Sequence, residues 1–128
     1  MNEEEFDEAV LDKNRSKEER IQAAFQLEDA IKEESLRNLG KALLTDESPI
    51  VRHEFAFSLG EIAKPKIAIP YLKEAIEKDK NIFVRHEAIL ALATLGDKSV
   101  KPLIEKFLKS NEPEIVESAE IALQRLGD

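Results

Sequence analysis

Apolar residues recur along this chain at the spacing of one face of an α-helix, and the same stripe returns about every 33 residues. The two central stripes consist of Val51, Phe55, Ala56, Leu59 and Ile62, and then of Val84, Ala88, Ile89, Leu92 and Leu95. A third stripe lies at Ile115, Ala119, Leu123 and Leu126, and upstream Arg20–Leu27 aligns with Arg52–Leu59 at a shift of 32 residues. Periods in the thirties are typical of repeat proteins in which each repeat is one pair of helices stacked on the last.

Partner helices lie between these stripes, and local signals mark where helices begin. The predicted partner helices are Ser35–Leu44, Ile69–Lys78 and Lys101–Lys109, and residues 1–13 are predicted to form a further helix that packs on the first repeat. Ser16 followed by Glu19 is a capping box, and Ser48 before Pro49 places a capping residue ahead of a proline at the first helical position. We therefore predict an all-α fold, a right-handed α-solenoid of about four helix pairs.

The composition is that of a single globular domain. A chain of 128 residues, 42% hydrophobic and 36% charged, can bury one continuous core, so residues 1–128 are predicted to be one domain. The absence of cysteine excludes disulfides, thiolate metal sites and thiol catalysis, and it fits a reducing compartment. No segment approaches the roughly 20 apolar residues of a membrane span, and the acidic start of the chain is unlike a signal peptide. We expect a cytoplasmic protein that does not interact with membranes.

The net charge of −8 bears on the class of partner. Neutralising phosphate needs clustered Lys and Arg, so we expect no binding of DNA or RNA. An acidic surface suits a protein substrate or partner with a basic surface. It also serves solubility alone, and the sequence does not distinguish these two explanations.

The two histidines of the chain occur in the same tetrapeptide, Val-Arg-His-Glu, in the two central repeats. His53-Glu54 and His86-Glu87 lie 33 residues apart, so they occupy equivalent positions on adjacent helices. We expect the four side chains to share one concave patch near helix N-termini. Imidazole and carboxylate together are a ligand set for a transition metal. The sequence therefore predicts that iron, or another divalent transition metal, binds through His53, Glu54, His86 and Glu87.

The terminal repeats differ at the same positions. The first repeat has Ile21-Gln22 there and the last has Glu117-Ser118, whereas a purely structural residue would be expected in all four repeats. The arginine of the tetrapeptide also recurs, but arginine at this place is typical of repeat stacking. The sequence offers no separate general base, nucleophile or glycine-rich phosphate loop, so any chemistry must depend on the metal.

The sequence resembles deoxyhypusine hydroxylase, a family of HEAT-repeat enzymes with two similar halves. The resemblance is carried by Ile50–Gly60 and Phe83–Leu92, which contain the His-Glu motifs at the family's spacing. Arg20–Leu27 resembles the opening helix of a half and Val116–Leu123 its closing helix, so the resemblance covers about residues 15–127. It implies the HEAT-repeat fold.

The resemblance also implies a function and an assembly. In the family, four His-Glu motifs hold a di-iron centre between the halves, and the enzyme, a monooxygenase, hydroxylates the deoxyhypusine side chain of a translation factor. By resemblance, His53, Glu54, His86 and Glu87 match two of the four motifs. Two chains related by a two-fold axis would supply all four, so the expected state is a homodimer with two irons. Two alternatives stay open: a non-enzymatic scaffold for protein interactions, and a metal- or oxygen-binding protein without hydroxylase activity.

Overall fold

The computed structural model describes residues 2–127; Met1 and Asp128 lie outside this range. Within it there are eight α-helices, two short 3₁₀ helices and no strand. The α-helices are α1 Glu3–Leu11, α2 Lys17–Leu27, α3 Glu33–Thr45, α4 Pro49–Gly60, α5 Pro65–Lys78, α6 Ile82–Leu95, α7 Lys101–Lys106 and α8 Pro113–Leu126. The 3₁₀ helices η1 (Lys98–Val100) and η2 (Phe107–Lys109) flank α7. The predicted all-α architecture is confirmed.

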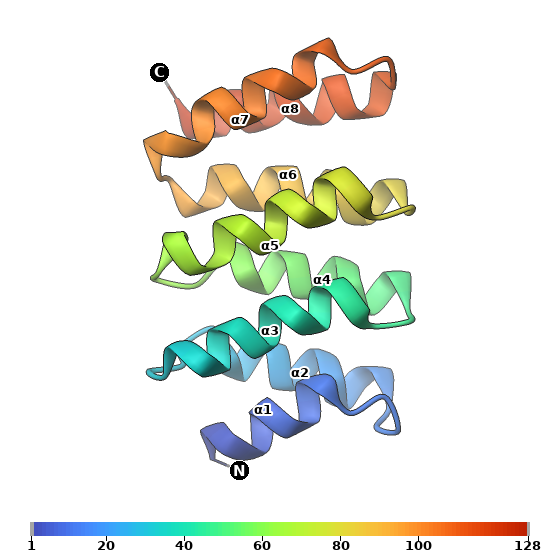
Figure 1. Cartoon of the computed structure of the whole chain (residues 1–128), viewed down its shortest axis with the longest axis vertical. Coiled ribbons are helices and arrows are strands. Elements are labelled where there is room, and N and C mark those ends of the chain that lie inside the picture. The colour runs from blue at the N-terminus through green and yellow to red at the C-terminus, as the bar shows by residue number, and fades with distance from the viewer. Residues whose placement is uncertain (1, 128) are drawn as a thin grey trace.

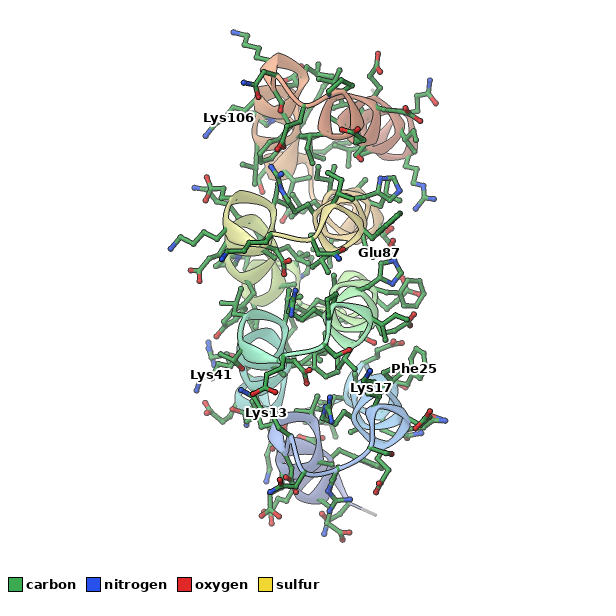
Figure 2. All side chains as sticks on the ribbon, turned by 90° about the vertical axis from the view of Figure 1, so that its right-hand side faces the viewer. Lys13, Lys17, Phe25, Lys41, Glu87 and Lys106 are labelled. Carbon is green, nitrogen blue, oxygen red and sulfur yellow. The ribbon has the colours of Figure 1, made fainter. Side chains whose placement is uncertain are left out.

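The helices form two layers in a single stack. Figure 1 shows the helix pairs stacked one on the next from the N-terminus to the C-terminus. Seen from the side, α1, α3, α5 and α7 make one layer, while α2, α4, α6 and α8 make the other (Figure 2). This is the arrangement of an α-solenoid, in which each pair packs only on its neighbours. None of the described helices is long and apolar enough to cross a membrane.

Helix boundaries follow local capping chemistry. The Ser16 hydroxyl accepts a hydrogen bond from the Glu19 backbone N–H at 3.1 Å, and the Glu19 carboxylate accepts one from the Ser16 N–H at 3.2 Å. This confirms the predicted capping box. Asn81 caps α6 by accepting from two backbone N–H groups, and Gly96 ends that helix at a φ of 73°. Glycine suits this position because a left-handed backbone is strained for other residues.

Two partner helices differ from the prediction at their ends. Helix α5 begins at Pro65 rather than at Ile69, because proline is tolerated in the first turn, where its missing N–H needs no partner. The segment predicted as one helix over Lys101–Lys109 ends its α-helical part at Lys106 and tightens into η2. Last turns of helices are often 3₁₀ in this way.

The predicted core stripes are buried between the layers. The fully buried positions include the large side chains Leu27, Leu39, Phe55, Leu72, Ile89 and Leu92. They belong to both layers and to successive helix pairs, so one continuous core extends along the stack. Leu95 and Leu123 are only partly buried at its edge. Burial of such apolar faces is the main source of stability in a repeat protein.

A ladder of arginine pairs joins each repeat to the next. Arginines in the first turns of α2, α4 and α6 each reach the carboxylate that precedes the next second-layer helix. The pairs, with their N–O distances, are Arg20–Asp46 at 2.9 Å, Arg52–Asp79 at 2.8 Å and Arg85–Glu112 at 2.6 Å. The predicted stacking role of the recurring arginine is confirmed. Because the same contact recurs at each step, equivalent positions of the second-layer helices lie side by side.

Candidate metal centre

The four candidate ligands lie on two adjacent helices of the second layer. His53 and Glu54 are in the second turn of α4, and His86 and Glu87 are in the equivalent turn of α6. The two helices approach closely: a Cβ placed on Gly60 of α4 would lie 2.9 Å from the Cβ of Ala91 on α6. Figure 2 labels Glu87 and Phe25 on the side of this layer that faces away from the first layer.

His53 lies between two carboxylates. Its Nδ1 is 3.5 Å from Oε1 of Glu54, and its Nε2 is 3.7 Å from Oε2 of Glu87 on the neighbouring helix. These distances are long for hydrogen bonds. The two ring nitrogens point in different directions, so one cation could face His53 with only one of these carboxylates, but the distances place both carboxylates beside the ring. Three of the four predicted residues are therefore neighbours, and both helices contribute.

His86 has a different partner. Its Nδ1 lies 2.5 Å from the hydroxyl oxygen of Ser118 on α8, and that hydroxyl also bonds to the Glu114 carbonyl oxygen at 2.7 Å. Within residues 2–127, no group of three or more His, Cys, Asp or Glu side chains converges closely enough to hold a metal ion. The structure thus divides the predicted set: His53 faces Glu54 and Glu87, whereas His86 faces Ser118. The complete four-residue ligand set stays a prediction.

Ser118 is a site residue that the sequence interpretation missed. It occupies the register position of Glu87 in the last repeat, where the sequence analysis predicts no ligand. The signal was present in the repeat itself. Each histidine contacts the residue one place after the equivalent histidine position in the next repeat, which is Glu87 for His53 and Ser118 for His86.

Exposed apolar side chains border both histidines. Ile50 and Phe83 are three residues before His53 and His86, and they are 65% and 70% exposed. A depression of about 260 Å³ beside His53 includes both of these apolar residues, and one of about 270 Å³ beside His86 includes Phe83. The equivalent positions in the terminal repeats are glutamates, Glu18 and Glu114. The two central repeats therefore share an apolar border as well as the His-Glu motif.

Residues 8–93 and 36–124 match the family described as HEAT repeats. The chain belongs to the HEAT-repeat family. Among curated proteins, this HEAT-repeat chain is 38% identical over 116 residues to the deoxyhypusine hydroxylase of Candida albicans, covering 84% of the chain and 36% of that protein. It is 36% identical over 118 residues to the enzyme of the same name from Danio rerio, covering 91% of the chain and 38% of that protein.

Solved structures agree with this assignment. The structure of human deoxyhypusine hydroxylase in complex with glycerol aligns with a TM-score of 0.88 and 26% identity, over 97% of this chain and 43% of that one. The resemblance inferred from the His-Glu repeats is confirmed. The chain spans between 36% and 43% of the length of these relatives.

The HEAT stack places nitrogen and oxygen donors together on its second layer. The described part of the second layer offers imidazole nitrogens and carboxylate oxygens at adjacent positions, with no cysteine in the sequence. Nitrogen and oxygen donors of this kind suit iron and other divalent first-row metals. The donor chemistry therefore fits a divalent transition metal.

Proposed function

We propose that this HEAT-repeat protein binds iron, or another divalent transition metal, through His53, Glu54, His86 and Glu87. The observation that supports this most directly is the position of His53 between Glu54 and Glu87, which come from two different helices. Two carboxylates beside an imidazole with no ion would repel each other, and a cation relieves that repulsion. The residue types are those of non-haem iron sites.

We further propose that two copies of the chain complete a di-iron site, as the two halves of a deoxyhypusine hydroxylase would. In one copy, no three candidate side chains of the described part converge on a point. A two-fold dimer is the commonest homo-oligomer, and it would place four His-Glu motifs around the contact. The exposed Ile50 and Phe83 support this assembly, because they offer apolar area beside the ligands.

The activity that best suits such a site is hydroxylation of a protein-bound deoxyhypusine side chain, the reaction in the name of the relatives. When bound, iron would supply the activation of oxygen. The residues of this chain would hold the metal, and the acidic surface with a net charge of −8 would attract a basic protein substrate.

Metal content tests the first step of this proposal. Protein purified with iron should contain metal, whereas a variant with both His53→Ala and His86→Ala should contain none. Helix content should be retained, because neither histidine is among the buried core residues. Gln22→Ala is the matched control, since Gln22 occupies the motif's glutamate position in the first repeat. Equal metal content in the wild type and the double variant would contradict the proposal.

A second candidate function is a non-enzymatic scaffold whose second layer binds a protein. The exposed apolar residues of that layer, Phe25, Ile50, Phe57 and Phe83, favour it. A scaffold needs no metal. The variant with both His53→Ala and His86→Ala would then still bind its protein partner, and its metal content would equal that of the wild type. Incubating the metal-loaded protein with a deoxyhypusine-containing protein and oxygen, and measuring the mass of the product, separates the two. A gain of one oxygen atom in the substrate supports the hydroxylase.

A further inference from the structure

The hydroxyl of Ser118 makes hydrogen bonds to two neighbouring groups. The side chain is buried, with 1% of the residue exposed, and its Oγ bonds to the Glu114 carbonyl oxygen at 2.7 Å within α8. The same Oγ lies 2.5 Å from Nδ1 of His86 on α6. The contact therefore connects a candidate metal ligand to the backbone of the next helix.

The directions of these two hydrogen bonds follow from donor counting. A carbonyl oxygen only accepts, so the single hydroxyl proton of Ser118 must point to Glu114. The Ser118 oxygen must then accept from His86, and Nδ1 of His86 must be the nitrogen with the proton. A neutral imidazole has one N–H, so Nε2 presents its lone pair. Within residues 2–127, Nε2 of His86 has no hydrogen-bond partner.

The other histidine has no equivalent arrangement. Both nitrogens of His53 face carboxylate oxygens, which accept and do not donate, so neither contact selects one tautomer over the other. The Ser118 contact uses Nδ1 of its histidine, whereas the equivalent Glu87 contact uses Nε2. The serine of the closing repeat thus distinguishes His86 from His53.

We propose that Ser118 is a positioning residue that holds His86 as the Nδ1–H tautomer and turns Nε2 toward a bound metal. This rests on the proposed function only in its second half, since the tautomer exists without metal. Ligating histidines usually donate their other N–H to a protein oxygen, which orients the ring and raises the basicity of the ligand. Ser118 has that role with its backbone bond to Glu114 as the anchor.

The tautomer is tested on the metal-free protein. Long-range ¹⁵N–¹H spectra at about pH 8, where an ordinary histidine is neutral, should show the proton of His86 on Nδ1. Ser118→Ala should move the His86 population toward Nε2–H, and Ser118→Thr, which keeps a hydroxyl, should restore it. Ser58→Ala is the matched control, because it also removes a buried helical hydroxyl but does not contact His86. A wild-type His86 protonated on Nε2, or no change in Ser118→Ala, overturns the proposal.

The metal arm uses Co²⁺ and Zn²⁺ as probes, with affinity measured by calorimetry. Ser118→Ala should bind about 10- to 100-fold more weakly than the wild type, the usual cost of losing such an outer partner, and Ser118→Thr should recover most of the loss. Equal affinity in Ser118→Ala overturns the positioning role. No binding to the wild type overturns the proposed function together with the metal half of this inference, while the spectra still decide the tautomer independently.

Discussion

Glu28 is a carboxylate placed where burial opposes its charge. It follows the last turn of α2, and burial raises its pKa; the nearby Ser58 hydroxyl opposes this in part, and Glu61 and Asp29 raise the pKa further. Neither Oε2 of Glu28 nor the Ser58 hydroxyl completes a hydrogen bond within the described residues. Because the pKa is raised on folding, this group favours the folded state below its unfolded pKa, and that contribution is lost as the pH rises through the folded value.

Glu28→Gln is therefore expected to stabilise the protein at pH 7 by about 1 kcal/mol, since a neutral amide avoids the buried charge and can bond to Ser58. The gain should shrink as the pH falls toward the ordinary glutamate value of 4.5, where the wild-type side chain is itself protonated. Urea unfolding between pH 4 and about pH 8 measures this. Glu120→Gln, on the exposed face of α8, is the control and should show no such pH-dependent gain. A variant less stable than the wild type at pH 7 would contradict the argument.

At the scale of the elements, the arginine ladder sets how one helix pair sits on the next. The Arg20–Asp46 pair is the most buried of the three, and the Arg20 Nη2 group makes a second contact to Asp46 at 3.3 Å. Asp46 also accepts from the Ser48 backbone N–H ahead of α4, so the pair connects α2 to the start of the helix that contains His53. The ladder therefore positions the candidate ligands as well as stabilising the stack.

Arg20→Ala is expected to cost about 3–5 kcal/mol, because it leaves the Asp46 carboxylate buried without its cation. Thermal and urea unfolding measure the loss. Arg37→Ala, which removes an exposed ion pair with Glu33 on α3, is the matched control and should cost less than about 1 kcal/mol. Similar losses in the two variants would mean that the ladder contributes no more than a surface ion pair.

In the whole molecule, the second layer has candidate metal ligands and apolar side chains that are exposed to solvent in a single chain. The His-Glu motifs and the exposed Ile50 and Phe83 occur only in the central repeats, between terminal repeats that have Glu18 and Glu114 at the apolar positions. A self-complementary patch of this kind suits an isologous contact, in which the same surface of both copies meets. The carboxylates in the patch would make such a contact depend on bound cations.

We therefore expect metal-loaded protein to sediment as a dimer and chelated protein to shift toward the monomer. The double variant with Ile50→Glu and Phe83→Glu, which introduces the glutamates of the terminal repeats, should remain monomeric in both states. Ile31→Glu is the control, because Ile31 is 85% exposed in the loop before α3 and should leave the dimer intact. A wild type that is monomeric with and without metal would contradict the di-iron hydroxylase proposal while leaving a site with a single metal possible.

The helices and their repetition could be predicted from the sequence. Helical periodicity identified buried positions such as Val51 and Val84, because which residues face the core depends on spacing within one helix. The Ser16–Glu19 capping box was equally local, since both partners lie within one turn. The register between repeats also followed from the sequence, and with it the expectation that the His-Glu motifs are neighbours. The start of α5 at Pro65 was missed although it is equally local, because a proline can begin a helix as well as end one.

Contacts between atoms of different helices could not be predicted from the sequence, because they depend on how the helices pack. The close approach at Gly60 and Ala91 brings α4 and α6 together, and side-chain rotation then sets His53 against Glu87 but His86 against Ser118. Equivalent positions in a repeat share a backbone environment, yet their partners differ because the next repeat has Glu in one case and Ser in the other. Because the Ser118 hydroxyl donates its proton to the Glu114 carbonyl oxygen, it can only accept from His86. This hydrogen-bond direction depends on the three-dimensional positions of both groups, which residue spacing does not contain.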